Sequence, residues 1–362
     1  MRLRVLILLA LMIGVIGFVL FMARRPERST SAANVVTNAP AATPDILRRV
    51  TRNTSIADEL AEPPSPSTNN LFQRMLDGSE DFQLTPEQLA EYLRQYGTNV
   101  ETLLATQKTN YIRLAAELFP NDPRVQYAAL TRDIFPEARR EWLDRFKKSA
   151  PDNAIADYLS ARDYLKAGDR ENALKDLANA AAKPHFNDYT LEQVQNMEDA
   201  QLSAGRSLVE AKYAAANALF LPQLAMFKGI AVDVQGIQKE YIAAGDTASA
   251  EALAQLSRSL GQHLSEGEGS RTLIGQLVGI AVERIGLNAL PADSQPAFLN
   301  GTVQQRIDEM QAFRQSSKSL TADFNAMLMR ANDTELISYF DRMKLQGEYK
   351  AMLWLRNRNQ LR

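Results

Sequence analysis

The 362-residue sequence contains no cysteine and only two histidines. The absence of cysteine excludes disulfide bonds, thiolate metal sites and cysteine nucleophiles, although it does not identify a redox compartment. His185 and His263 lie far apart and without a neighbouring metal-binding pattern such as H-E-x-x-H. We therefore predict no metal site, no cofactor and no catalytic residue, and we expect both histidines to be structural or solvated.

The sequence also lacks an imbalance of charge. It has 41 basic and 43 acidic residues, which give a formal net charge of −2. Such a balance provides no long-range attraction to the phosphates of nucleic acid. Nucleic acid is therefore not an expected partner.

Aromatic residues make up only 7% of the chain, and alternating runs of Val, Ile and Thr, which a half-buried sheet needs, are scarce. Apolar residues nevertheless reach 45%. Ala and Leu supply most of them, and they are surrounded by Glu, Gln, Lys and Arg, all of which lose little side-chain freedom in a helix. The composition predicts an all-α protein with a sizeable core.

One long apolar run lies near the amino terminus. Two arginines precede Val5–Ala23 and two follow it. As a helix these 19 residues reach about 28 Å, close to the hydrocarbon thickness of a bilayer. The competing interpretations are a buried core helix and a cleaved signal peptide, whose apolar region is usually shorter, at about 7–15 residues. We predict that residues 1–25 form an uncleaved transmembrane signal-anchor.

The orientation of this anchor is less strongly specified, because arginines flank both of its ends. All of the chain that is expected to fold follows the span, and a short basic amino terminus usually stays in the cytoplasm. We predict that the protein is a single-pass membrane protein with its body outside the cytoplasm, which is the periplasm if the source is a Gram-negative bacterium. A cytoplasmic body is the alternative.

A change of composition separates the anchor from the body. Residues 26–69 are rich in Pro, Ser, Thr, Ala and Asn and predict a disordered linker, which as a flexible chain would reach roughly 35–40 Å. Beyond the linker, residues that start and end helices recur at short intervals. Thr85–Gln88 and Thr190–Gln193 each resemble a capped helix start. We expect helical repeats over residues 70–269 and a helical region that caps the array over residues 270–362.

One pattern occurs twice in the body, as YLKAGDRENA over Tyr164–Ala173 and as YIAAGDTASA over Tyr241–Ala250. In each copy the tyrosine would fill the interface of a helix pair, and the glycine would end the first helix with a positive φ. The aspartate would cap the second helix, and the alanine would let the two backbones approach closely.

This pattern resembles the tetratricopeptide repeat, over roughly half of the body. It departs from that family at Ser160, where a leucine is usual, and at Gln238, where a small residue is usual. The resemblance implies antiparallel helix pairs stacked as a solenoid, and a concave surface that holds a peptide, a helix or another protein. It implies no chemistry.

In the register of that family, the first helix of each pair lines the concave surface. The resemblance places five side chains there: Tyr158, Arg162, Lys166, Gln235 and Lys239. Arg162 and Lys239 occupy matching positions of the two copies. They imply a modestly positive groove that suits an acidic peptide or a terminal carboxylate.

We therefore predict a membrane-tethered scaffold or adaptor that binds a protein or a peptide. Two alternatives stay open. A cell-envelope enzyme, for example a cell-wall hydrolase in a helical frame, is compatible with the sequence because the two carboxylates of such a site can lie far apart in the chain. A structural assembly subunit would expose apolar patches larger than a few hundred Å².

The anchor prediction can be tested on the mature protein. Mass spectrometry of the membrane fraction should detect peptides that contain Val5–Ala23, because an uncleaved span stays in the chain. A mature amino terminus near Asn34 would instead show that the segment is a cleaved signal peptide.

Overall fold

The computed structural model describes residues 83–219, 221–267 and 271–360. These residues form fifteen α-helices and a short 3₁₀ helix, and no strand occurs among them. The predicted all-α class is confirmed. The first part of the chain contains α4 (Pro86–Tyr96), α5 (Val100–Ala105), α6 (Thr109–Leu118), α7 (Pro123–Thr131), η2 (Pro136–Ala138), α8 (Arg139–Ser149), α9 (Ile155–Ala167) and α10 (Arg170–Ala182).

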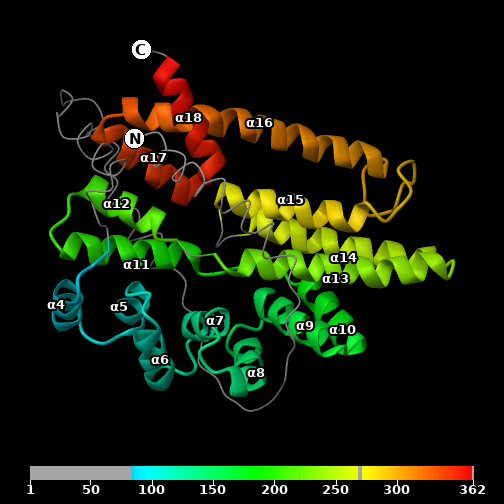
Figure 1. Ribbon diagram of the computed structural model, residues 1–362, viewed down its shortest axis with the longest axis horizontal. Coiled ribbons are helices and arrows are strands. Elements are labelled where there is room, and N and C mark those ends of the chain that lie inside the picture. Colours follow the sequence, from blue (N-terminus) through cyan, green and yellow to red (C-terminus); the bar gives the residue numbers. More distant parts are fainter. Residues whose placement is uncertain (1–82, 220, 268–270, 361–362) are drawn as a thin grey trace, which may run out of the picture.

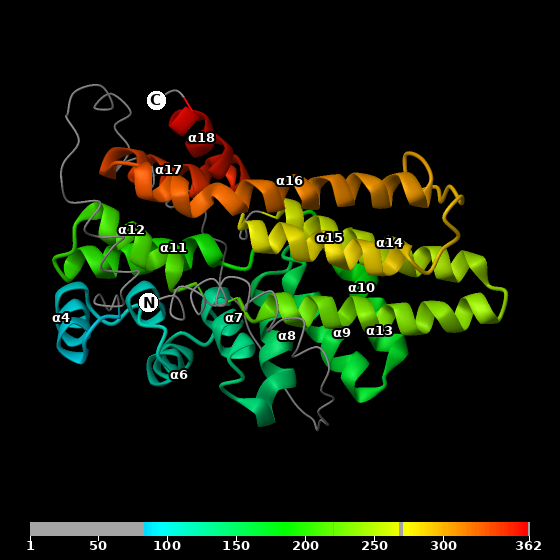
Figure 2. The same ribbon diagram turned by 45° about the horizontal axis from the view of Figure 1, so that its top comes forward.

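The remaining helices are α11 (Thr190–Ser203), α12 (Leu208–Asn217), α13 (Gln223–Ala243), α14 (Thr247–Glu266), α15 (Leu273–Leu287), α16 (Val303–Arg330), α17 (Asp333–Gln346) and α18 (Glu348–Gln360). The helices lie in three layers, with α4–α10 on one side, α11–α15 in the middle and α16–α18 on the other side (Figure 1). After a turn of 45°, α16–α18 still lie on the opposite side of α11–α15 from α4–α8 (Figure 2).

Local capping residues start many of these helices. The predicted start of α4 is confirmed, because Thr85 Oγ1 accepts from the Gln88 N–H at 3.2 Å and Gln88 Oε1 accepts from the Thr85 N–H at 3.0 Å. The predicted capping role of Thr190 is wrong. Its N–H donates instead to Asp188 Oδ1 at 3.2 Å, since the carboxylate two residues earlier satisfies the first turn of α11 and leaves Tyr189 with a φ of +55°.

Both copies of the repeated pattern form the turn expected from the sequence. Gly168 and Gly245 have φ values of +77° and +78°. Asp169 and Asp246 each accept a hydrogen bond from the backbone N–H three residues later, at 3.1 and 3.0 Å. The alanine that ends each copy is fully buried. The two turns join α9 to α10 and α13 to α14, and each of these helices packs on its partner.

The two helix pairs differ in size. The helices α9 and α10 have 13 residues each, whereas α13 and α14 have 21 and 20. The longer pair extends past the shorter one and is flanked by α15 and α16 (Figure 1). The structure thus contains paired helices whose length changes along the chain.

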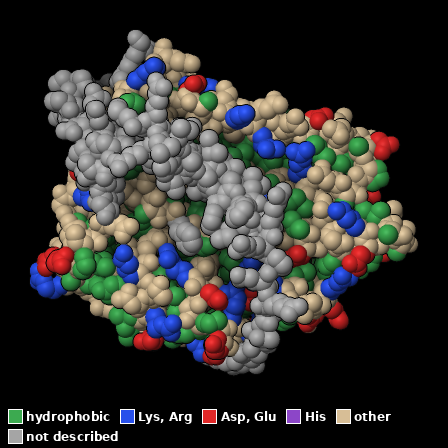
Figure 3. All heavy atoms as spheres, viewed as in Figure 1, with side chains coloured by type: hydrophobic (Ala, Val, Ile, Leu, Met, Phe, Trp, Pro, Cys, Tyr) green, Lys and Arg blue, Asp and Glu red, His purple; other side chains and the backbone are tan. Residues whose placement is uncertain are grey.

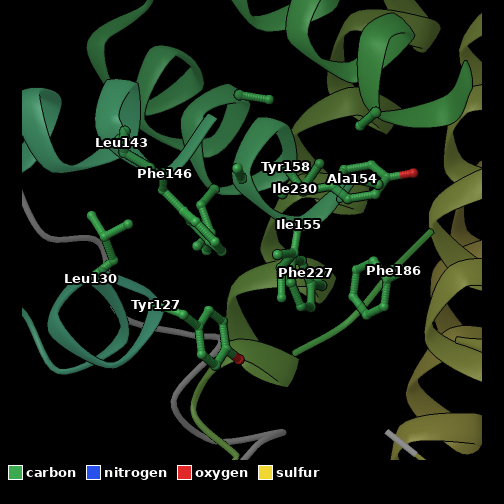
Figure 4. Packing of buried hydrophobic residues seen from close by; sticks show 14 of the residues in the cluster. Tyr127, Leu130, Leu143, Phe146, Ala154, Ile155, Tyr158, Phe186, Phe227 and Ile230 are labelled. Carbon is green, nitrogen blue, oxygen red and sulfur yellow. The ribbon is translucent and has the colours of Figure 1, made fainter. Parts of the chain in front are cut away.

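The larger core lies where the first and middle layers meet (Figure 4). Its aromatic centre joins three segments, since the ring centroid of Tyr158 lies 6.2 Å from those of Phe186 and Phe227. The ring of His263 stacks on Phe186, and its Nδ1 lies 3.0 Å from the hydroxyl of Tyr158. Burial lowers the pKa of His263. The neutral ring is therefore favoured at this site, although the nearby end of α14 by itself would favour a cation.

Backbone contact between α14 and α15 depends on three glycines. A Cβ added at Gly261 would lie 2.6 Å from the Gly279 carbonyl oxygen, and one added at Gly279 would lie 2.4 Å from the Gly261 carbonyl oxygen. A Cβ at Gly286 would lie 2.6 Å from the Cβ of Ser257. Only hydrogen fits at these positions, so the two helices approach more closely than ordinary side chains permit.

A second core joins the third layer to α12 and α15. The 28-residue helix α16 buries one narrow stripe. Four of its buried residues recur at intervals of seven: Val303, Met310, Ser317 and Phe324. This spacing keeps one face of a long helix directed at its neighbours while the rest of the surface stays exposed.

Four buried charges connect α17 to the pair α11–α12. Lys212 Nζ lies 2.8 Å from Glu198 Oε1 and 2.6 Å from Asp341 Oδ1. Lys344 Nζ lies 2.6 Å from Glu198 Oε2 and donates to Gln195 Oε1 at 3.0 Å. The charges balance, and each ammonium has more than one partner. Removing one member of such a cluster leaves an unpaired buried charge, which typically costs about 3–5 kcal/mol.

The predicted boundary at residue 270 falls between α14 and α15, although these helices pack on each other through their glycines. The larger core therefore includes residues on both sides of that boundary, for example Leu264 and Val278. Within the described part of the chain, no helix has both the length and the apolar composition of a membrane span. The predicted anchor and linker lie outside the described residues.

The close contact between α14 and α15 predicts a difference between two glycines. Gly261→Ala should lower the free energy of unfolding by about 1–3 kcal/mol, because its Cβ must displace the backbone of Gly279 rather than a flexible side chain. Gly236→Ala on α13 is the control. Its Cβ meets no atom within 4 Å, so the change should raise the free energy by about 0.5–1 kcal/mol. Denaturant unfolding of the full chain in detergent measures both, and equal values would contradict the close contact.

Candidate functional site

The five side chains that the sequence placed on one surface lie in different environments. Tyr158 is fully buried in the larger core, so it lines no open surface. Gln235 on α13 donates to the Ile285 carbonyl oxygen at 2.6 Å and thereby contacts α15. Lys239 is exposed. Packing in the core holds Tyr158, and the carbonyl oxygen of Ile285 holds Gln235. The structure thus does not bring these two side chains together with the basic residues.

Arg162 and Lys166 lie on α9 beside Asp233 of α13. Burial lowers the pKa of both basic groups, and the charge of Arg162 lowers the pKa of Lys166 further. Burial also raises the pKa of Asp233, while the two basic groups oppose that rise. A carboxylate from the neighbouring helix therefore offsets part of the predicted positive charge. Binding of an acidic partner at Arg162, Lys166 and Lys239 stays a prediction.

A cavity of about 50 Å³ lies elsewhere, between the first and middle layers. It is lined by residues of α5, α6, α7 and α11 and by the segments that precede α11 and α13. In Figure 1 these helices meet below the start of α11. On the face seen in Figure 3, the acidic and basic side chains of the described residues are interspersed. The residues that line the cavity include two arginines, Arg124 and Arg132, and two acids, Asp188 and Glu192.

Asp188 lines this cavity and is almost fully buried. The preceding loop is held by Asn153, whose Nδ2 donates to the Asn187 carbonyl oxygen at 2.7 Å and whose Oδ1 accepts from the Asn187 N–H at 3.0 Å. Gln223 Nε2 donates to Asp188 Oδ2 at 3.0 Å. Burial raises the pKa of Asp188 above its ordinary value of 3.8, and the hydrogen bonds from Thr190 and Gln223 oppose that rise.

Tyr127 of α7 lines the same cavity, and its hydroxyl has no hydrogen-bond partner among the described residues. The side chain is 7% exposed, and its ring packs on Phe146 and Tyr189. In Figure 4 the hydroxyl points away from Leu130. Burial and the charge of Asp188 raise the pKa of Tyr127, so the phenol stays protonated. A buried hydroxyl without a partner is uncommon in folded proteins.

Charged residues surround Tyr127 and Asp188, but most of these charged residues already form hydrogen bonds or ion pairs with other side chains. Arg124 contacts Asp122 Oδ2 at 2.7 Å and Glu101 Oε1 at 2.5 Å. Arg132 donates to the amide oxygen of Gln107 at 2.8 Å. Glu192 accepts from the side-chain amide of Asn187 at 3.1 Å, and burial raises the pKa of its carboxyl. The cavity thus combines Arg124, which is paired with carboxylates, and Arg132 with the two carboxylates of Asp188 and Glu192.

The backbone is unusual at the same place. Three non-glycine residues of the described chain have positive φ, and two of them, Gln107 at +56° and Tyr189 at +55°, line the cavity. L-residues reach this region only at a conformational cost, which is often found at functional sites. The surrounding contacts hold both residues in this conformation.

The size of the cavity limits its ligand. Pockets for drug-sized molecules and cofactors usually measure about 300–1,000 Å³, whereas this one measures about 50 Å³. It has room for a side-chain tip or a few water molecules. Across the described residues, no group of three or more His, Asp or Glu side chains has an arrangement that would hold a metal ion.

Comparison with known proteins finds no matching family model, no matching curated protein and no matching solved structure. The resemblance to the tetratricopeptide repeat is neither supported nor excluded by this result. Function is therefore inferred from the geometry of the site.

Sequence reasoning did not identify Tyr127 and Asp188 as site residues. Asp188 lies two residues before Thr190–Gln193, which in sequence resembles a capped helix start, and Tyr127 lies in a segment that sequence reasoning did not single out. The available signal was an acid shortly before a helix, which an N-cap explains equally well. Only the fold brings the phenol and the carboxylate to one cavity.

The raised pKa of Asp188 predicts a pH dependence of stability. A carboxyl whose pKa is higher in the folded state binds its proton more tightly there. Its contribution to stability is complete below the unfolded pKa and is lost as pH rises through the folded pKa. The free energy of unfolding of Asp188→Asn, relative to the parent, should therefore increase as pH rises from about 4 to about 7.

Glu240→Gln provides a control of opposite sign. The pKa of Glu240 is lowered by its hydrogen bonds with Arg170, so its contribution to stability is lost as pH falls. Chemical unfolding at several pH values measures both differences. A pH-independent difference for Asp188→Asn would show that its pKa is not raised.

Proposed function

We propose that this protein is a membrane-tethered adaptor that binds a protein or peptide partner through its helical array. The observation that carries the proposal is the small polar cavity between α5–α7 and α11, whose lining residues include Tyr127 with its unpartnered hydroxyl. Its volume suits one side chain of a partner and is too small for a cofactor. The rest of the partner would lie over the surrounding helices.

The repeated helix pairs support this proposal. The pairs α9–α10 and α13–α14 share the same glycine turn and aspartate cap. We propose that they belong to a tetratricopeptide-like solenoid, in which stacked pairs present an extended binding surface. The unequal lengths of the pairs make this solenoid irregular. An amino-terminal anchor at Val5–Ala23 would hold this surface beside a membrane.

A hydrolase is the second candidate, because one observation favours it. Asp188 and Glu192 line the same cavity, and burial raises the pKa of both carboxyls, as in many catalytic acids. A glycan strand, however, needs an open cleft much larger than about 50 Å³. Release of soluble fragments from purified cell wall, abolished by Asp188→Asn, would favour the hydrolase over the adaptor.

The adaptor proposal is tested by site-specific photocrosslinking in native membranes. Gln193, which is partly exposed and lines the cavity, should carry the photoreactive side chain. We expect a covalent product of one defined mass. Placing the same group at Gln304, on the exposed face of α16, should give no such product.

A blocking variant makes the result specific to the cavity. Ala128→Trp would fill the cavity from α7, so it should reduce the Gln193 product about tenfold or more, since losing one well-filled anchor typically costs at least 1.4 kcal/mol. Its thermal stability must be measured in parallel. A product that is equally strong at Gln193 and Gln304, or unchanged by the blocking variant, would contradict the proposal.

A further inference from the structure

Two polar groups that line the cavity differ in their hydrogen bonding. The hydroxyl of Tyr127 has no hydrogen-bond partner among the described residues, although the side chain is more than nine-tenths buried. Asp188, which is 1% exposed, accepts from neutral donors, which include the Thr190 N–H, the Thr190 hydroxyl and the Gln223 amide. None of these donors neutralises a carboxylate. The cavity therefore lacks a positively charged donor next to Asp188.

The nearby arginines do not supply that charge. Arg124 is shared between Asp122 and Glu101, and its contacts with them are 2.7 and 2.5 Å. Arg132 makes its hydrogen bond with the amide of Gln107. Counting these two arginines against Glu101, Asp122, Asp188 and Glu192 leaves a formal charge of −2 when every carboxyl is ionised. An anionic ligand would be repelled, and a cation would be attracted.

The walls of the cavity restrict the shape of that cation. Leu104, Ile112, Ala128 and Pro222 provide apolar surface around the polar groups. An unbranched alkyl stem with a charged tip matches this combination, because the stem packs on apolar side chains while the tip reaches the acceptors. An ammonium group is compact and carries three donors and no acceptor. A volume of about 50 Å³ fits such a tip.

We propose that the cavity binds the ammonium group of a lysine side chain of the partner, with Asp188 and the Tyr127 hydroxyl as its acceptors. The ammonium donates one N–H to the carboxylate of Asp188 and one to the oxygen of Tyr127, and it remains protonated throughout. Glu192 adds a second negative charge to the same cavity. This inference rests on the adaptor function for its biological role, but the cation site itself is tested independently.

The probe for this test is n-butylammonium, which reproduces the end of a lysine side chain. Saturation-transfer NMR with the full chain in a non-ionic detergent should show saturable binding of n-butylammonium. Butanol and butanoate are the matched neutral and anionic probes. Both should bind at least about tenfold more weakly, because a hydrogen bond to a charged group is worth about a factor of ten or more.

Three variants test whether n-butylammonium binds at Asp188 and Tyr127. Asp188→Asn should weaken n-butylammonium binding about 10- to 100-fold, and Tyr127→Phe about threefold to tenfold. Asp233→Asn is the matched control, because Asp233 is also a carboxyl with a raised pKa but does not line the cavity. It should bind like the parent. If Asp188→Asn fails to fold, Tyr127→Phe, which keeps the ring, still decides the outcome.

Each outcome bears on one of the two proposals. Equal binding by the parent, Asp188→Asn and Tyr127→Phe, stronger binding of butanoate, or no saturable binding would overturn the lysine site. Water alone then occupies the cavity. If n-butylammonium binds as expected and no crosslinked partner forms at Gln193, the cation site stands and the adaptor function fails. If a partner crosslinks without n-butylammonium binding, the adaptor stands and the lysine site fails.

Discussion

The placement of the C-terminal layer on the middle layer depends on a charge cluster buried where α11, α12 and α17 meet. Glu198 contacts both Lys212 and Lys344 through its two oxygens, and Asp341 completes the pairing of Lys212. These groups are well separated from water, so each charge requires its partner from another helix. The C-terminal layer therefore has one register on the middle layer, because a shift of α17 would leave Glu198 and Lys212 unpaired. Apolar contact alone would define that register less strictly.

Much of the local structure follows from short-range rules and could be predicted. Thr85 starts α4 because its side chain and that of Gln88 satisfy each other's backbone N–H groups. Gly168 ends α9 because it tolerates a positive φ, and Asp169 then caps α10. These features need only neighbouring residues. They identify helix pairs reliably but do not say how the pairs stack.

The candidate site could not be predicted, because it depends on contacts between distant segments. Tyr158 resembled a surface residue of a repeat, yet packing against Phe186 and Phe227 places it in the core. Asp188 displaced Thr190 as the acceptor at the start of α11, and it lies near Tyr127 only because the first and middle layers pack together. Local sequence contains no information about such proximity.

The loop before α11 connects the core directly to the cavity. Phe186 is buried among Tyr158, Phe227 and His263, and two residues later Asp188 lines the cavity. A movement of the carboxylate by even a side-chain width would disturb a close-packed aromatic cluster. The cavity is therefore preorganised. A substitution that repacks this aromatic cluster should therefore also displace the carboxylate of Asp188.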